Sequence, residues 1–370
     1  MHIAVPAETN PGELRVSITP DSVARLVKAG HAVRVQCGAG ARAGFPDSAY
    51  ESVGATLADA AGVYEGAQLV CRVQPPSGEE IVAMPRGATM LSLLHPGRNS
   101  ALLDALAKHD ITALALELVP RITRAQSMDV LSSQSTVAGY KAVLIGASAL
   151  PKFLPMLTTA AGNVSPAKVF VIGAGVAGLQ AIATARRLGG VVSAFDVRPA
   201  AREQVLSLGA SFVANDLVAA GAETAGGYAR AQSEDEAERT RAALAAHVKD
   251  VDLVVTTAQI PGRPAPRLIT ADMVASMRPG AVIVDLAAES GGNCDLTLAG
   301  ETVQSGNVTI IGPVNVAATV PFHASQMFGK NILALVTHLS AKDGALVLDP
   351  NDEITGAMTV VRDGSVVTRT

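Results

Sequence analysis

The sequence predicts an α/β protein with two doubly wound, parallel β-sheets. Strand-like and helix-like segments alternate along the first 118 residues, and the same alternation starts again at residue 168. The strand-like segments of the second half consist almost entirely of valine, isoleucine and alanine. Alternation of strands and helices is typical of parallel sheets, and strands that are apolar throughout are buried on both faces.

The first half begins with a strand followed by a helix whose start is well marked. Thr19 is a good N-cap and Pro20 is tolerated in the first helical turn, so we expect a helix from Asp21 to Ala29. The expected strands are HIAVP (2–6), HAVRVQC (31–37), QLVCRV (68–73), ATMLSLL (88–94) and ITALALEL (111–118).

The second half repeats this plan and then changes. A helix starting at Thr270, a helix over 323–341 and a hairpin over 356–368 are predicted, the hairpin because Asp363-Gly364 suits its turn. If the late helix returns to the first domain, that domain is discontinuous. We therefore predict a domain of residues 1–132 plus 320–370 and a domain of residues 133–319. The expected strands of the latter are KVFVI (168–172), VVSAF (191–195), VDLVVTT (251–257), AVIVDLA (281–287) and NVTIIG (307–312).

Composition excludes several classes of protein. The chain has 370 residues, 49% of them hydrophobic and 17% charged, which is long enough for two domains with buried cores. A net charge of −4 without blocks of like charge argues against nucleic acid as a partner. Apolar runs are too short to enter a membrane, and the N-terminus does not have the pattern of a signal peptide. Three dispersed cysteines favour a cytoplasmic protein with reduced thiols and no metal site.

A glycine-rich turn is the sharpest motif in the chain. Gly173, Gly175 and Gly178 follow a predicted strand and open a predicted helix, and Asp196 comes 18 residues after the last glycine, at the end of the next strand. This context is typical of a Rossmann-like domain that binds a dinucleotide on the N-terminus of the helix. Asp196 favours NAD over NADP because a carboxylate binds ribose hydroxyls and repels a 2′-phosphate. Arg198 is the one residue that favours NADP.

Other segments are expected at the same edge of the second sheet. Ligands of such sheets bind beyond the carboxyl ends of the strands, which here include Val176, Val197 and Gln259. The segment AETAGGYAR (222–230) is either a flap that covers the adenosine side through Tyr228 or a plain surface loop.

The segment PRITRAQSMDVLSSQS (120–135) is predicted to be a long polar loop between a strand and a helix over 136–149. Loops of this length are usually functional or disordered. Arg121 and Asp129 could bind the acceptor and the donors of a nicotinamide carboxamide, and Gln126 could bind a ribose or a second ligand.

The loop lacks a group that could accept a proton. Dehydrogenases of alcohols or amines need a general base, most often histidine or lysine. Elsewhere, Arg15 and Arg72 could bind a carboxylate, and His95 could act as a base, although a structural role is the commoner one for a loop histidine. Hydride transfer between two nicotinamides needs no proton acceptor. We therefore interpret the loop as one that binds a cofactor rather than one that converts a small substrate.

These motifs together resemble a known family. PRITRAQSMDVLSSQS, GAGVAGLQAIATARRLG, AETAGGYA, IVDLAAESGGNC and HASQMFGKNI are similar to the soluble NAD(H)-binding component of proton-translocating NAD(P) transhydrogenases. The resemblance covers essentially the whole chain. Alanine dehydrogenases are more distant relatives that share the two-domain plan but not the RAQSMD segment.

The resemblance implies a function and a set of site residues. The second domain would bind NAD(H), and a separate subunit would hold NADP(H) and receive the hydride directly. A membrane-embedded proton-channel subunit would couple transfer to proton movement, and this chain would be a homodimer attached to the inner face of the cell membrane through its partners. The family's loop residues match Arg121, Gln126, Ser127, Met128, Asp129 and Ser132, and its dinucleotide contacts match Val176, Asp196, Val197, Arg198, Gly227 and Tyr228.

Two positions depart from the family pattern. Gln259 replaces an apolar residue, and Thr240 stands where the family has a glutamine that points toward the cofactor. Two other functions stay open: an alanine-dehydrogenase-like enzyme using Arg15, Arg72 and His95, and a nucleotide-sensing module without turnover. Glu289 argues against the former, because those enzymes have an aspartate there.

Overall fold

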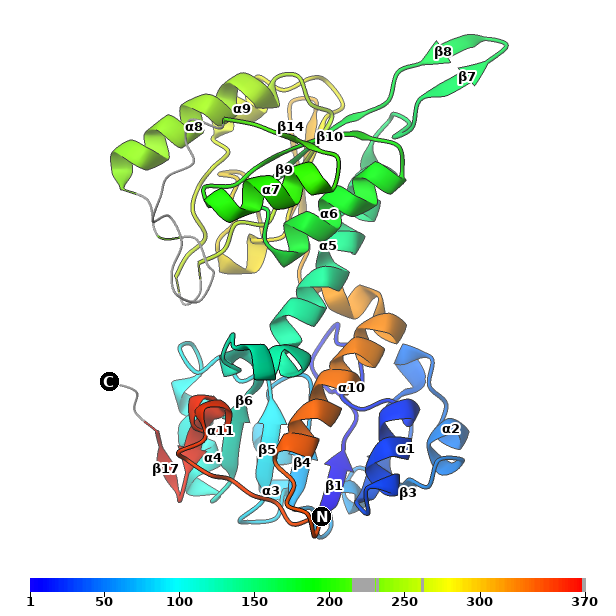
Figure 1. The fold of residues 1–370 in the computed structure, drawn as a ribbon, viewed down its shortest axis with the longest axis vertical. Coiled ribbons are helices and arrows are strands. Elements are labelled where there is room, and N and C mark those ends of the chain that lie inside the picture. The colour runs from blue at the N-terminus through cyan, green and yellow to red at the C-terminus, as the bar shows by residue number, and fades with distance from the viewer. Residues whose placement is uncertain (215–229, 231–232, 261–262, 368–370) are drawn as a thin grey trace. The chain divides into compact units, whose positions relative to one another are not determined.

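The computed structural model describes residues 1–214, 230, 233–260 and 263–367. The chain divides into two compact units, one formed by Met1–Gln134 with Ala317–Thr370 and the other by Ser135–Val316 (Figure 1). The first unit is thus made of two separate stretches of sequence. That the units are independent domains with the boundaries given above stays a prediction.

The sheet of the first unit is mostly parallel. At one edge, β16 (Thr359–Arg362) and β17 (Ser365–Val366) add two antiparallel strands. The parallel order is typical of dinucleotide-binding folds, and it places a topological switch point between β1 and β4. The parallel strands, in spatial order, are β3 (Thr56–Ala58), β2 (Ala32–Gln36), β1 (His2–Val5), β4 (Leu69–Cys71), β5 (Thr89–Ser92) and β6 (Thr112–Ala115).

Helices cover both faces of this sheet, so successive residues of a central strand enter different cores. In β1, Ile3 and Val5 belong to one hydrophobic cluster and Ala4 belongs to another. The helices are α1 (Pro20–Lys28), α2 (Asp47–Glu51), α3 (Gly78–Ala83), α4 (Ser100–Lys108), α10 (Pro321–His338) and α11 (Glu353–Met358), with 3-10 turns η1 (Ala41–Ala43), η2 (Gly62–Tyr64), η3 (Leu116–Leu118) and η4 (Thr123–Met128).

The sheet of the second unit has the same plan. Parallel strands follow the order β11 (Ser211–Phe212), β10 (Val191–Phe195), β9 (Lys168–Ile172), β12 (Leu253–Thr256), β13 (Val282–Asp285) and β15 (Val308–Ile311), with β14 (Thr302–Ser305) antiparallel at the edge. The helices are α5 (Val130–Ala149), which contains one boundary between the units, α6 (Val176–Arg187), α7 (Pro199–Ser207), α8 (Glu234–Val248) and α9 (Ala271–Ala275), with turn η6 (Ala288–Ser290). Turn η7 (Val316–Thr319) contains the other boundary. The parallel α/β prediction is confirmed, with antiparallel strands added at the edges.

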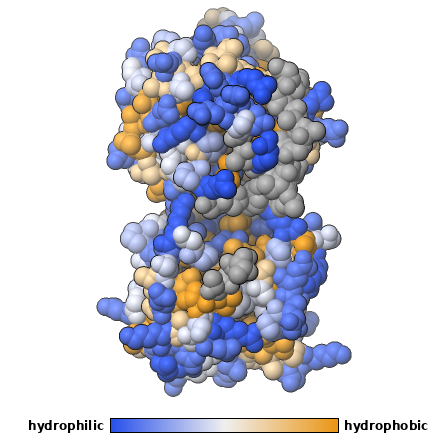
Figure 2. Space-filling model, turned by 90° about the vertical axis from the view of Figure 1, so that its left-hand side faces the viewer, coloured by the Kyte–Doolittle hydropathy of each residue, from blue (hydrophilic) through white to orange (hydrophobic). Residues whose placement is uncertain are grey.

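Local sequence signals explain several element boundaries. Thr270 caps α9 by accepting a hydrogen bond from the Met273 amide, as expected. Asp363 and Gly364 both have positive φ, 51° and 69°, which is the requirement of a two-residue hairpin turn. The valine-rich strands lie inside, and the face in Figure 2 is mostly hydrophilic with separate hydrophobic patches.

Two segments differ from the prediction. Residues 120–135 are not one loop, because they contain η4 and because α5 already begins at Val130. Asp129 explains the early start: its carboxylate accepts the Ser132 amide at 2.9 Å, which is the bond of an N-cap. The expected strand over 111–118 ends at Ala115, and the following turn lets the Glu117 carboxylate accept the Leu94 amide at 3.0 Å.

A protruding arm was not predicted. Strands β7 (Leu157–Thr159) and β8 (Gly162–Val164) form a two-stranded antiparallel ribbon that extends from the body of the second unit (Figure 1). Its short strands are too polar and exposed to produce an apolar pattern in the sequence.

The described helices include none whose length and hydropathy would suit a membrane span.

Candidate functional site

The glycine turn of the second unit joins β9 to α6. Gly173 has a φ of +94°, and a Cβ on Gly178 would lie 1.8 Å from the Gly173 carbonyl oxygen. These two glycines are required by the turn and by the packing of helix on strand. Gly175 differs, because a Cβ there would meet nothing closer than an Arg198 nitrogen at 3.9 Å. The backbone at Gly175 is therefore open to a ligand at the N-terminus of α6, next to half-exposed Val176.

Asp196, at the end of β10, organises this turn. Its Oδ2 accepts the Ala174 amide at 2.7 Å, and its two oxygens accept the Nε and Nη2 groups of Arg198 at 2.9 and 2.8 Å. Asp196 is buried, and Val197 and Arg198 are partly buried beside it. Arg198, the residue that favoured NADP, is thus bound to the carboxylate that favoured NAD.

A second carboxylate shapes the ends of β12 and β13. Asp285 is fully buried and accepts hydrogen bonds from the Thr256 and Thr297 hydroxyls and from the Asn293 amide, at 2.8, 2.7 and 2.7 Å. Asn293 in turn holds Ala258 through bonds of 3.0 and 2.8 Å. Asp285 and Asn293 are not among the predicted site residues, although an aspartate at the end of an apolar strand, followed by Gly-Gly-Asn, is a usable signal for them.

The structure shows where Gln259 and Thr240 lie, the two positions that depart from the family pattern. The Gln259 side chain donates to the Leu286 carbonyl at 3.0 Å and so links the two strand-end loops. Thr240 is buried within α8. Gly227 and Tyr228 lie outside the described residues, as does most of the segment 222–230.

In the first unit, the predicted site residues of the segment 121–132 lie on and around η4 and in the first turn of α5. Arg121, Gln126 and Ser127 are exposed, while Met128 is buried against the core. The Ser132 hydroxyl donates to Asp129 Oδ2 at 2.6 Å, so these two side chains fix each other. Lone pairs on the Asp129 carboxylate can still accept from a ligand's amide group, since an ionised carboxylate has about four acceptor sites.

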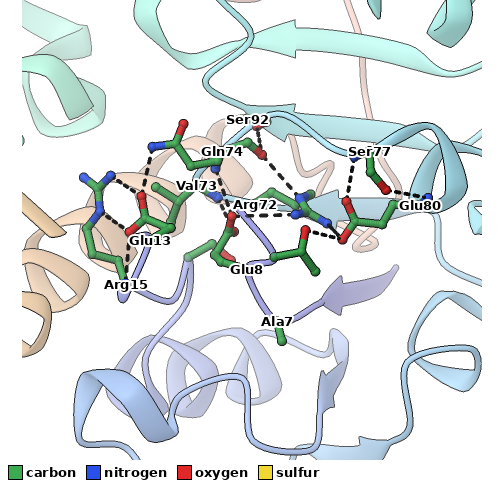
Figure 3. A network of polar contacts seen from close by, with 12 residues as sticks. Ala7, Glu8, Glu13, Arg15, Arg72, Val73, Gln74, Ser77, Glu80 and Ser92 are labelled. Atoms are coloured by element: carbon green, nitrogen blue, oxygen red, sulfur yellow. Dashed lines mark hydrogen bonds and ion pairs between the residues drawn. The ribbon is translucent and has the colours of Figure 1, made fainter. Parts of the chain in front are cut away.

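A buried polar network fills the carboxyl edge of the first sheet near the switch point (Figure 3). Arg72 is fully buried, and its Nη1 donates to Glu80 Oε1 at 2.6 Å. Glu8 lies 3.7 Å from Arg72 Nη2 and accepts the Val73 and Gln74 amides at 2.7 and 3.1 Å. Burial raises the pKa of Glu8 against the opposing charge of Arg72. The Glu8 carboxylate thus occupies the two backbone amides at the end of β4, to which an anionic ligand could otherwise bind.

Arg15 is paired in the same way. Its Nε and Nη2 donate to the two oxygens of Glu13 at 2.7 and 2.6 Å, and its Nη1 donates to Gln134 at 2.8 Å. Gln74 donates to Glu13 Oε2 at 2.9 Å and joins this pair to the Arg72 cluster (Figure 3). Both arginines that could have bound a substrate carboxylate are therefore charge-paired with carboxylates of the chain itself, and among the described residues only Arg72 Nη2 of their donors is buried without a hydrogen-bond partner.

His95 lies in a constrained loop. It has a φ of +48°, its backbone amide donates to Glu117, and its Nδ1 lies 3.8 Å from Glu117 Oε1. These contacts fit the structural role that is usual for such a histidine. The described residues also contain no cluster of histidine, cysteine and carboxylate side chains that could hold a metal ion.

The two sheets and the glycine turn define the chain as an α/β protein of the dinucleotide-binding class. A family model described as the alanine dehydrogenase/PNT N-terminal domain matches residues 4–138, and its C-terminal counterpart matches residues 142–369. The chain therefore belongs to the alanine dehydrogenase/PNT family.

Within this family, the chain is more similar to the transhydrogenase relatives than to the alanine dehydrogenases. The chain is 47% identical to an NAD(P) transhydrogenase alpha subunit of Rhodospirillum rubrum, over 99% of this chain and 98% of the relative. Its structure matches the crystal structure of transhydrogenase from Sinorhizobium meliloti with a TM-score of 0.90 at 44% identity, over 99% and 100% of the two chains. Identity to the alanine dehydrogenase of Halomonas elongata is 32%, over 100% and 95%. The resemblance to transhydrogenase alpha subunits is confirmed, with alanine dehydrogenases more distant.

Replacing Glu13 with glutamine should destabilise the protein in a pH-dependent way. Burial acts to raise the pKa of Glu13, but hydrogen bonds and charge from Arg15 outweigh it and lower this pKa from 4.5 to about 2. A lowered pKa in the folded state stabilises the protein above the ordinary pKa, and the stabilisation is lost as the pH falls toward 2. We expect Glu13→Gln to cost about 3 kcal/mol at neutral pH.

Denaturant unfolding at a series of pH values measures this effect. The difference between the wild type and Glu13→Gln should be constant from about pH 8 to about pH 5 and shrink below that range. Glu65→Gln is the control, because Glu65 is an 83% exposed partner in a surface pair and should change stability little. A difference that does not depend on pH would show that the Arg15 pair does not stabilise the fold.

Proposed function

We propose that this chain is the NAD(H)-binding subunit of a proton-translocating NAD(P) transhydrogenase. It would transfer a hydride from NADH directly to NADP⁺ held by a partner subunit. The observation that carries the proposal is the paired state of Arg15 and Arg72. With these two cations already matched and His95 in a structural role, the chain's chemistry would be limited to holding a cofactor. The high identity to transhydrogenase alpha subunits supports the same conclusion.

The glycine turn and Asp196 fit a dinucleotide. The open backbone at Gly175 and the N-terminal amides of α6 would bind the pyrophosphate, and Gly173 and Gly178 would keep the turn tight. Asp196 would accept from the adenosine ribose, with Val176, Val197 and Arg198 around it. Gln259 would contribute through the backbone near the end of β12, and Gly227 and Tyr228 through the segment that follows β11.

The segment 121–132 would orient the nicotinamide. When bound, NADH supplies the hydride from its nicotinamide ring. Arg121 would donate to the carboxamide oxygen, Asp129 would accept from the carboxamide nitrogen, and Gln126 would bind a ribose or the second nucleotide. Ser127, Met128 and Ser132 would hold these groups in place.

Partners would supply what this chain lacks. We infer an NADP(H)-binding subunit and a membrane-embedded proton-channel subunit, which would attach this chain to the cytoplasmic face of the cell membrane. The names of the relatives as alpha subunits support the existence of other subunits. We also infer a homodimer, because the side chains of Phe153 and Met156, at the base of the β7–β8 arm, are 59% and 66% exposed. An isolated two-stranded ribbon is marginally stable in water. We therefore infer that a second copy of the chain packs against the arm and buries these two side chains.

Mixing the purified chain with an NADP(H)-binding subunit of a transhydrogenase tests the main proposal. We expect reduction of an NADP⁺ analogue by NADH only when both proteins are present. Asp129→Asn should reduce this rate at least about 10-fold, because the carboxylate acceptor is lost. Asparagine caps helices as well as aspartate does, so the melting temperature should change little.

Other outcomes of this assay would support other functions. NADH oxidation by the isolated chain with pyruvate and ammonia would favour an amino acid dehydrogenase. Tight NADH binding without transfer to any partner would favour a nucleotide sensor.

Replacing Asp196 with asparagine should relax the preference for NADH over NADPH. Asparagine can still accept the Ala174 amide, but it no longer repels a 2′-phosphate and it releases the Arg198 guanidinium. We expect the ratio of the NADPH and NADH dissociation constants to fall about 10-fold, equivalent to about 1.4 kcal/mol. Fluorescence titration measures both constants. Asp272→Asn, at an exposed site in α9, is the control, and an unchanged ratio in Asp196→Asn would contradict the role of Asp196.

Charged substitutions at the base of the arm test the homodimer. The double variant Phe153→Asp with Met156→Asp should be monomeric by sedimentation at concentrations where the wild type is dimeric. Val82→Asp is the matched control, because the side chain of Val82 is 71% exposed on α3 of the first unit. A monomeric wild type would disprove the dimer, and a dimeric double variant would disprove this interface.

A further inference from the structure

We propose that Asn331, on helix α10, is a positioning residue that sets the place of the segment 121–132 for hydride transfer. This inference rests on the proposed function, because the segment's role belongs to that proposal. The observation behind it is one hydrogen bond from a buried side chain to a backbone carbonyl far away in the chain. Asn331 Nδ2 donates to the Ser127 carbonyl at 2.8 Å.

Helix α10 and η4 share an apolar contact around this bond. Ala125 and Met128 of the segment are buried in the same hydrophobic cluster as Phe328 and Ile332 of α10. Apolar packing alone permits sliding, because it has no preferred direction. A hydrogen bond to a carbonyl does have one, so Asn331 sets the position of Ser127 along the helix.

The amide of Asn331 is costly where it lies. Asn331 is only 8% exposed, and its Oδ1 finds no hydrogen-bond donor among the described residues. A buried acceptor without a partner costs about 1–3 kcal/mol, so an apolar side chain would suit the core better. The one hydrogen bond that the amide does make is from Nδ2 to the Ser127 carbonyl, within the proposed nicotinamide-binding segment. We infer that the position of this segment is what the amide provides in return for its energetic cost.

Two further contacts join this part of the chain to the C-terminal stretch, one made by Gln134, just beyond the segment, and one made by Arg124 within it. Gln134 Nε2 donates to the Ala324 carbonyl of α10 at 3.1 Å. Arg124 Nη2 lies 2.9 Å from Asp352 Oδ2, but half of the Arg124 side chain is exposed, and such surface pairs contribute little. Asn331 is therefore the contact on η4 whose loss should be felt most directly by Gln126, Ser127 and Asp129.

Asn331→Leu separates positioning from stability. Leucine keeps the volume and suits the apolar core, while Ser127 is exposed and its carbonyl can accept from water instead. We expect the melting temperature to be kept or raised and the NADH dissociation constant to change less than about threefold. The transfer rate to the partner subunit should fall by up to about 100-fold, because a misplacement of about 1 Å can have that effect.

Thr337→Val is the matched control on the same helix. Thr337 is exposed, and its hydroxyl donates to the Leu333 carbonyl within α10, so its loss should leave transfer unchanged. Asn331→Ala serves as a second variant if leucine does not fit. A transfer rate at the wild-type level in either folded Asn331 variant would overturn the proposal.

Amide hydrogen exchange of residues 123–128 decides the inference independently of transfer. Exchange there should be faster in Asn331→Leu than in the wild type and in Thr337→Val. If the wild type shows no transfer with any partner, the proposed function fails, but faster exchange in Asn331→Leu would still support the positioning role. Unchanged exchange in Asn331→Leu would overturn it in either case.

Discussion

The contact between helix α10 and the segment 121–134 is the interaction on which the position of the proposed nicotinamide-binding residues depends. The segment carries many exposed polar side chains, and η4 within it is a short 3-10 turn that packs against α10. Met128 and Ala125 pack into the core beside α10, and Gln134 and Ser127 are held by hydrogen bonds to that helix. Without the C-terminal stretch the segment would lose its apolar contact with α10 and both of these hydrogen bonds.

Burial of charge is the second constraint. An arginine inside a protein needs carboxylates nearby, because an unpaired buried charge is very costly. Arg15 and Arg72 meet this need with Glu13 and Glu8, from loops at the carboxyl edge of the first sheet, and with Glu80 of α3. The network neutralises both arginine charges that a substrate carboxylate could have used, and this is the physical reason to favour the proposed cofactor-holding role over metabolite turnover.

The two units have the same strand order but differ at their switch points. In the second unit the edge is formed by a glycine turn whose backbone at Gly175 is open, and Asp196 and Asp285 order the neighbouring loops by accepting backbone amides. In the first unit the corresponding edge is closed by the side chains around Arg72. One strand order would thus serve the proposed dinucleotide site in one unit, while it holds a packed polar network in the other.

The sequence by itself determined the features that depend on neighbouring residues. Strand periodicity, the glycine turn, the Thr270 cap and the Asp363-Gly364 turn are local, so their physics is contained in a few consecutive side chains. Only the tertiary structure decided that Asn331 meets Ser127, 204 residues away. It also decided that Arg72 lies beside Glu8, which comes from a separate loop at the edge of the same sheet. Such pairings depend on which loops the sheet brings together, and no periodic pattern records that.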